Sequence, residues 1–485
     1  MFSFLIYPVL GSNEFEAPYV QTTSGTVIGH PARNKTNAIE FLGIRYAQAT
    51  NGSLRYQPPV PFVSSNTYDA SQYSPACPFN PAPPLPTFPN KSSTFDRIYT
   101  TATSLAFSED CLALNIWTPF IFPKELKPVL FFIHGGRFVS GTTDNPLYQG
   151  QYLAATGDVV VVTIELVFFY FQKWVAEVKA NIELFGGEPS KILMYGQCTG
   201  GLSVNYHAFA WPDDPIASAS MSISGVLNDK PNSPELSKSY WDQLALLVDC
   251  NDDVEEIVVK CMQELPYQTI LEAIKKLPSM PTEFLPQTQF LPTIDGEIVF
   301  SDYATRANTG RFAKLPYLVG NTNHESGYYA ISAFAQNITL TQAEWDLHDL
   351  KRFTCAVSQS VSIRLKHHVP VYQYRFFDDF DNTRLYHSSG SYHLSDLHMR
   401  HGVGTDVSGI ENTSEEDKLS RSMMRILISF AREPVGGLER LGWKQAEIEG
   451  NVILNALGYN NLPEALHVNP QIYNARCTSL GLETL

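Results

Sequence analysis

The chain has 485 residues, of which 44% are hydrophobic and 17% are charged, a composition that excludes an intrinsically disordered protein and allows a large buried core. Its 49 acidic and 34 basic residues give a formal net charge of -15, which argues against nucleic acid as a partner. No Gly/Ser-rich linker, charge block or internal repeat divides the chain, so we expect residues 12–485 to form one domain.

Residues 1–11 form a candidate export signal. The run FSFLIYPVL at residues 2–10 is apolar and ends at Gly11, which is typical of a secretory signal, with an ordinary apolar start as the alternative. No later apolar run is long enough and free enough of charge to cross a membrane, so we expect a secreted protein without a membrane span. Five Asn-x-Ser/Thr sequons agree with export: Asn34, Asn51, Asn90, Asn337 and Asn412.

Apolar runs and turn residues predict the main elements. Residues 20–32 contain short β-rich runs separated by glycine, which predict hairpins, and the proline-rich residues 78–90 predict an irregular loop. From residue 128, apolar runs alternate with helical stretches such as 172–185 and 200–210. This alternation predicts an α/β fold with a mainly parallel sheet buried on both faces. The expected strands lie in residues 128–136, 158–166, 191–197, 217–225, 315–321 and 369–377.

The segment MYGQCTGG at residues 194–201 resembles a nucleophile elbow. Gly196 and Gly200 stand two positions before and after Cys198, between a predicted strand and a predicted helix. Such an elbow holds its central residue in a strained backbone conformation, and side chains at the flanking positions would clash. Upstream, FIHGGRFVSG at residues 132–141 is placed to donate backbone N–H groups to an oxyanion, and His134 is expected to order this loop.

Together these motifs resemble the type-B carboxylesterase/lipase family, which includes the cholinesterases, and in particular secreted fungal carboxylesterases. The resemblance implies an α/β-hydrolase fold, with a large, mainly parallel central sheet, helices on both faces and long loops. It also implies hydrolysis of a small-molecule ester without a metal or cofactor. The motifs occur in family order: SEDCLALNIWTP (108–119), PVLFFIHGGRFVSG (128–141), FGGEPSKILMYGQCTGG (185–201), LVGNTNHESGYY (318–329) and LYHSSGSYHLSDL (385–397).

The resemblance assigns a role to each residue of the expected catalytic site. Cys198 stands where the family has its nucleophilic serine, Glu325 matches the acid of the triad and His393 matches the base. The expected oxyanion donors are the backbone N–H groups of Gly136, Arg137 and Thr199.

The same resemblance bears on the seven cysteines. It implies two disulfides, Cys77 with Cys111 and Cys250 with Cys261. We pair the remaining Cys355 and Cys477, which leaves Cys198 as a free thiol, either reactive or a small buried hydrophobe. No acidic or cysteine spacing makes a zinc site of His387, His398 and His401, which we expect to be solvated loop residues.

Three features depart from the family pattern. Besides Cys198 for serine, Gln197 stands where the family usually has Glu and Thr199 where it usually has Ala. Arg137 replaces a third glycine, and its side chain is expected to strain the loop, to fill the acyl site or to swing outward to an acid. Residues 159–180 contain no glycine, proline or other turn residue, so either residues 167–171 close a short connection or a family segment is absent after Leu166.

Two functions follow from these observations. The first is a carboxylic ester hydrolase that uses Cys198, His393 and Glu325 through an acyl-enzyme intermediate, with a preference for activated esters or thioesters. The alternative is a catalytically inactive binding or adhesion protein of the same fold. The altered elbow favours the alternative, whereas the presence of both Glu325 and His393 favours the enzyme.

Overall fold

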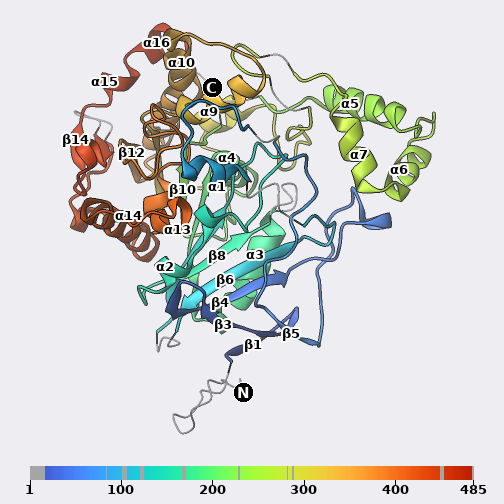
Figure 1. Ribbon diagram of the computed structural model, residues 1–485, viewed down its shortest axis with the longest axis horizontal. Coiled ribbons are helices and arrows are strands. Elements are labelled where there is room, and N and C mark those ends of the chain that lie inside the picture. The colour runs from blue at the N-terminus through green and yellow to red at the C-terminus, as the bar shows by residue number, and fades with distance from the viewer. Residues whose placement is uncertain are drawn as a thin grey trace.

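The computed structural model describes residues 17–82, 85–100, 106–120, 125–165, 171–227, 230–280, 282–286, 289–447 and 453–482. The candidate signal at residues 1–11 and the connection at residues 166–170 lie outside these ranges. The described part of the chain forms one eleven-stranded sheet and one three-stranded sheet, with helices packed around the larger sheet (Figure 1).

The centre of the large sheet is parallel, as the apolar runs predict. Its strands, in spatial order, are β8 (Val160–Ile164), β7 (Lys127–Ile133), β9 (Gly187–Gln197), β10 (Ala219–Ile223), β11 (Tyr317–Thr322), β12 (Val371–Phe376) and β13 (Leu454–Leu457). Antiparallel strands extend both edges: β6 (Ala113–Pro119), β4 (Lys35–Arg45) and β3 (His30–Ala32) beyond β8, and β14 (Leu466–Val468) beyond β13. The six runs expected as strands are β7 to β12.

Both faces of this sheet are buried because successive apolar side chains point to opposite sides. In β7, Leu130 and Phe132 pack into one core cluster, whereas Val129, Phe131 and Ile133 pack into another. The helices that cover the first face are α2 (Gln151–Ala154), α12 (Leu397–Arg400), α13 (Gly404–Ser408) and α14 (Ser414–Arg432). Those that cover the second face are α3 (Phe171–Asn181), α4 (Thr199–Ala210), α8 (Tyr303–Asn308) and α11 (Cys355–Lys366). Helices therefore lie on both faces, which confirms the predicted α/β architecture.

The remaining elements surround this core. The small sheet contains the predicted hairpin β1 (Tyr19–Thr22) and β2 (Gly25–Ile28), together with β5 (Thr67–Asp69). Helices α5 (Pro234–Leu247), α6 (Glu255–Glu264) and α7 (Tyr267–Ile274) lie together at the right of Figure 1 and share a core of their own. The other helices are α1 (Ser93–Thr100), α9 (Ser326–Ala335), α10 (Gln342–Asp349), α15 (Gln471–Asn474) and α16 (Arg476–Ser479). Short turns are η1 (Gly52–Leu54), η3 (Pro146–Tyr148), η5 (Ile182–Phe185), the π-helical η6 (Leu350–Thr354), η7 (Glu439–Leu441) and η8 (Tyr459–Asn461).

Three disulfides crosslink the chain. They link Cys77 to Cys111, Cys250 to Cys261 and Cys355 to Cys477, which are the pairs expected above. All seven cysteines lie within the described residues, and Cys198 is the one left as a free thiol. Within the described ranges, no helix has the length and hydropathy needed to cross a membrane.

Candidate active site

The elbow places Cys198 between β9, which ends at Gln197, and α4, which begins at Thr199. The backbone of Cys198 has φ 57° and ψ -123°, a strained conformation for a residue with a side chain. A Cβ atom added at Gly196 would lie 2.4 Å from the carbonyl carbon of Gly200, and one added at Gly200 would lie 2.0 Å from a backbone oxygen of β7. Both glycines are therefore required by close backbone packing, as the motif predicts.

The glycine loop, residues 134–141, lies against this elbow. An added Cβ at Gly135 would lie 2.8 Å from Cβ of Cys198, and Gly136 has φ 122°. The carbonyl of Gly136 accepts hydrogen bonds from the backbone N–H groups of Val139 and Ser140, which close a tight turn. The N–H groups of Thr199 and Gly136 lie beside the thiol of Cys198 and help to lower its pKa. Two of the three expected donors therefore converge on the sulfur atom.

Arg137 strains the loop and points outward, which are two of the three outcomes expected above, but its partner differs from the expected acid. Its φ of 58° places it in the left-handed region, so the loop carries backbone strain at this position. Its exposed side chain extends to another segment, where Nη2 donates a hydrogen bond of 3.0 Å to the backbone carbonyl of Pro286. The guanidinium thus binds a carbonyl rather than the acid considered above.

Glu325 lies between β11 and α9, and its carboxylate is fully buried. Oε2 accepts a hydrogen bond of 2.5 Å from Nδ1 of His393. Oε1 accepts hydrogen bonds from Oγ of Ser224 at 2.6 Å and from the backbone N–H of Thr322 at 2.7 Å. Both carboxylate oxygens are therefore held in place, and they fix the orientation of the imidazole.

His393 connects Glu325 to the thiol. Burial lowers the pKa of His393, but the negative charges of Cys198 and Glu325, and hydrogen bonds to both, raise this pKa to about 10. Burial raises the pKa of the Cys198 thiol, but the charge of His393 and the hydrogen bonds from His393, Thr199 and Gly136 bring this pKa below its ordinary value. The site therefore favours a thiolate paired with an imidazolium near neutral pH.

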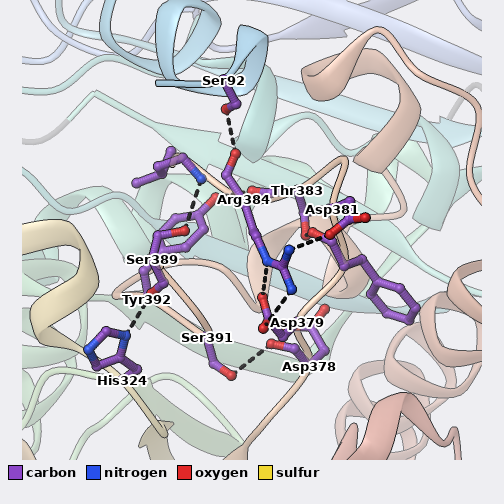
Figure 2. A network of polar contacts seen from close by, with 12 residues as sticks. Ser92, His324, Asp378, Asp379, Asp381, Thr383, Arg384, Ser389, Ser391 and Tyr392 are labelled. Atoms are coloured by element: carbon purple, nitrogen blue, oxygen red, sulfur yellow. Dashed lines mark hydrogen bonds and ion pairs between the residues drawn. The ribbon is translucent and has the colours of Figure 1, made fainter. Parts of the chain in front are cut away.

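A polar network holds the histidine loop, residues 377–393 (Figure 2). Arg384 binds both carboxylate oxygens of Asp379, at 2.6 and 2.9 Å, and also pairs with Asp381. His324, which precedes Glu325, donates from Nδ1 to the carbonyl of Ser389 at 2.8 Å. The loop that carries the acid and the loop that carries the base are thus joined next to the Glu325–His393 contact.

A buried carboxylate supports the glycine loop from below. Glu165 accepts hydrogen bonds from Oγ1 of Thr142 at 2.9 Å and from the backbone N–H of Thr143 at 2.6 Å. Its other oxygen lies 3.6 Å from Nε2 of His134. Burial lowers the pKa of His134, but the nearby carboxylate of Glu165 raises this pKa above the ordinary value. His134 therefore orders the loop, as expected, and it does so through an acid that sequence reasoning missed.

Other residues that shape the site were also missed or misjudged. Gly225 follows β10, and a Cβ added there would lie 1.8 Å from the carbonyl oxygen of Cys198. The only signal for Ser224 and Gly225 was their position at the end of an apolar strand. The expectation that His398 and His401 are solvated is wrong. Both are fully buried and contact the hydroxyls of tyrosines, because the segment after His393 turns into α12 beneath the sheet instead of remaining a surface loop.

Metal ligands do not gather anywhere in the ranges that the structure describes. Those residues contain no group of three or more His, Cys, Asp or Glu side chains that could hold a metal ion.

Comparisons with known proteins agree with this architecture. The carboxylesterase family matches residues 16–166 and 173–354, and the match is interrupted where the sequence lacks turn residues. A chlorogenic acid esterase of Aspergillus niger is 28% identical over 466 residues, covering 90% of this chain and 86% of that protein. Secreted lipase 5 of Gibberella zeae is 26% identical over 495 residues, covering 91% of this chain and 90% of that protein. A cholinesterase of Mus musculus is 29% identical over 347 residues, covering 66% and 56%.

The family match covers more than half of the chain and includes the strands and loops that carry Cys198 and Glu325. Helices on both faces of a large mixed sheet give the chain an α/β-hydrolase fold. This protein belongs to the carboxylesterase family and is a carboxylic ester hydrolase.

Proposed function

We propose that the protein hydrolyses small-molecule carboxylic esters with Cys198 as the nucleophile, His393 as general base and acid, and Glu325 as the carboxylate that orients His393. One observation carries this proposal: buried contacts run from Glu325 to His393, which lies beside a free, half-buried thiol whose pKa is lowered by His393 and by the N–H groups of Thr199 and Gly136. An inactive scaffold has no need of this arrangement, so the geometry favours the enzyme over the binding protein.

The first half-reaction is acylation of the thiol. Sγ of Cys198 attacks the carbonyl carbon of the ester, and the carbonyl oxygen becomes an oxyanion that accepts hydrogen bonds from the N–H groups of Gly136 and Thr199. The ester C–O bond then breaks, and the alcohol leaves with the proton from Nε2 of His393. The products of this step are the free alcohol and an acyl thioester on Cys198.

The second half-reaction returns the thiol. Nε2 of His393 takes a proton from water, and the water oxygen attacks the thioester carbon. The C–S bond breaks, the carboxylic acid leaves and the thiolate–imidazolium pair is restored. Glu325 keeps Nδ1 protonated throughout, so that every proton transfer takes place at Nε2.

The sulfur atom also determines which esters suit the site. A thiolate leaves a tetrahedral adduct more readily than an alkoxide does, because a thiol is the stronger acid. Adducts of ordinary alkyl esters therefore tend to collapse backward, whereas phenolic esters and thioesters proceed to the acyl-enzyme. We propose activated esters and thioesters as the preferred substrate class.

The test compares the purified protein with two variants at position 198. The parent is expected to hydrolyse p-nitrophenyl acetate and an acyl thioester, and Cys198→Ala to lose roughly 10³-fold or more in kcat/KM. Cys198→Ser serves as the conservative control, because it keeps a nucleophile beside the same donors, and it should shift the preference toward ordinary alkyl esters. Equal rates in the parent and the Ala variant would refute the role of the thiol.

We further propose that the protein acts outside the cell. Three disulfides persist best in an oxidising compartment, and a relative of similar length is named as a secreted lipase. The asparagine side chains of four sequons are exposed and suit glycosylation: Asn34, Asn51, Asn90 and Asn337. The apolar residues at the start of the chain supply the export signal in this proposal.

A further inference from the structure

We propose that Gln197 is a positioning residue matched to the thiol nucleophile: its neutral carboxamide holds the Nε2 edge of His393 without placing a second negative charge beside Cys198. The two substitutions in the elbow, Cys198 for serine and Gln197 for the usual Glu, then work as a pair. This inference rests on the proposed function, and it concerns a residue to which the mechanism above gives no role.

The geometry places Gln197 against the reacting nitrogen. Gln197 is the last residue of β9 and is 1% exposed. Its amide nitrogen lies 3.0 Å from Nε2 of His393, whose Nδ1 is already bound to Glu325. Gln197 and Cys198 therefore share the one remaining nitrogen of the imidazole.

The glycine loop confines the carboxamide. A Cβ added at Gly135 would lie 3.0 Å from Oε1 of Gln197 and 2.8 Å from Cβ of Cys198. The side chain of Gln197 thus fills the space between the loop, the thiol and the imidazole. A residue in this place controls both where Nε2 points and which charge the thiol faces.

A carboxamide suits both protonation states of His393. When Nε2 is unprotonated, it can accept a hydrogen bond from the amide N–H of Gln197, whose nitrogen lies 3.0 Å away. When Nε2 carries the proton, the amide turns over and offers its carbonyl oxygen instead. His393 passes through both states in each half-reaction, so one neutral partner supports it throughout.

A carboxylate at position 197 would act differently because the thiolate already has one acidic neighbour. The active pair consists of a negative Cys198 and a positive His393, and Glu325 adds a second negative charge at Nδ1. A glutamate at 197 would set three negative groups around one imidazolium. It would raise the pKa of the thiol and would compete with the leaving alcohol for the Nε2 proton.

The other titratable groups that face the pair do not offset such a charge. Tyr148 from η3 and Tyr329 from α9 have pKa values well above the ordinary range, chiefly because both are buried, so both stay neutral. The positive charges of Arg352 in η6 and of Arg137 act on Tyr329, and Arg137 directs its guanidinium to the carbonyl of Pro286. The charge at position 197 therefore acts directly on Cys198.

The first test measures how the rate of alkylation of Cys198 by iodoacetamide depends on pH. In Gln197→Glu, the acidic limb of the profile is expected to move upward by about one to two pH units. The sign follows because His393 is protonated at this limb and Cys198 alone loses a proton, which an added negative charge opposes. Gln197→Met is the matched control: it removes the hydrogen bonds without adding charge, so its acidic limb should stay at the parent position while kcat falls.

The second test places Gln197→Glu in two backgrounds. With Cys198 present, kcat/KM for p-nitrophenyl acetate should fall about tenfold, the equivalent of one pH unit in thiolate fraction. In Cys198→Ser the loss should be smaller or become a gain, because a serine carries no charge before it reacts. An unmoved acidic limb, an equal change in both backgrounds, or a Met variant with the parent kcat would overturn the inference.

The two proposals fail separately. Alkylation needs no ester turnover, so a shifted limb in a protein that hydrolyses nothing would retain the inference and remove the proposed function. If Cys198→Ala loses turnover as expected but the acidic limb of Gln197→Glu does not move, the proposed function stands and the inference about Gln197 fails. Circular dichroism of each variant establishes that the fold is intact, and the Met variant keeps the inference testable where the charged variant does not fold.

Discussion

At the scale of single residues, the site depends on how many groups determine the proton on His393. Glu325 binds Nδ1, while Cys198 and Gln197 meet at Nε2, so the elbow after β9, the end of β11 and the histidine loop each supply part of this cluster. Because the surroundings are buried, each neighbouring charge acts on the imidazole with little screening by water. Changing one of these groups should therefore move the pH range in which the site is active.

Glu325→Gln tests this dependence at the alkaline end. The variant loses the carboxylate that helps to raise the pKa of His393 to about 10, so this pKa should fall and the alkaline limb of activity should move to lower pH. The value of kcat/KM should also fall, by roughly 10³- to 10⁴-fold, because an amide does not fix the tautomer of the imidazole. The pH profile of kcat/KM with p-nitrophenyl acetate measures both effects.

Ser224→Ala is the matched control for this prediction. It removes the hydrogen bond to Oε1 of Glu325 but keeps the carboxylate charge, so the alkaline limb should stay close to the parent position. A parent-like limb in Glu325→Gln would contradict the role given to the carboxylate.

The residue scale also shows which parts of the site the sequence could predict. Motif positions located Cys198, Glu325 and His393, which the structure brings together, because an elbow and a strand end constrain the neighbouring chain. The sequence could not predict which partners the side chains of the site contact. The partner of Arg137 is a carbonyl 149 residues away, and the partner of Gln197 is 196 residues away. No local pattern encodes such contacts, because they depend on how separate loops pack.

At the scale of elements, the elbow is held by the ends of two strands. The backbone N–H of Cys198 donates to the carbonyl of Ile223 in β10 at 2.9 Å, and Gly225 passes directly beneath the elbow. The elbow is therefore a property of β9, α4 and the end of β10 together.

Gly225→Ala tests this arrangement. The new methyl group would lie 1.8 Å from the carbonyl oxygen of Cys198, so the elbow must move and the sulfur atom must leave its hydrogen-bond donors. We expect kcat/KM to fall about 10²-fold or more, as for loss of an oxyanion donor. Gly296→Ala is the control for a substitution without a clash: its φ of 76° strains an alanine and costs stability, but no atom lies within 4 Å of the added Cβ, so its kcat/KM should match the parent. Similar activities in the two variants would show that the elbow tolerates displacement.

Element prediction succeeded where apolar runs were long. The runs that form β7 to β12 are bounded by turn residues and buried on both faces, which is a strong signal in the sequence. The last two strands of the chain, β13 and β14, have four and three residues, and such short segments carry no clear periodicity. Residues 166–170, between β8 and α3, lie outside the described ranges. The hypothesis that a family segment is absent after Leu166 therefore stays a prediction.

At the scale of the whole molecule, one disulfide ties the end of the chain to the site. Cys477 in α16 is bonded to Cys355, the first residue of α11. Two residues earlier, the ring of Phe353 in η6 lies 5.3 Å from the imidazole of His393. The Cys250–Cys261 bond, in contrast, joins residues within the group of α5 to α7, whose core is separate from the central sheet.

This difference makes the two bonds a matched pair for measuring stability. The Cys355–Cys477 bond spans 122 residues and the Cys250–Cys261 bond spans 11, so the longer loop restricts the unfolded chain more. Replacing both cysteines of the longer loop by alanine should lower the free energy of unfolding by about 2 kcal/mol more than the same change in the shorter loop. Denaturant titration of both double variants measures this difference.

The variant without Cys355 and Cys477 should also lose kcat, since Phe353 is no longer anchored beside His393, whereas the variant without Cys250 and Cys261 should keep the parent kcat. The reverse order of stabilities would show that contacts in the folded state, rather than closure of the unfolded chain, determine what each bond contributes.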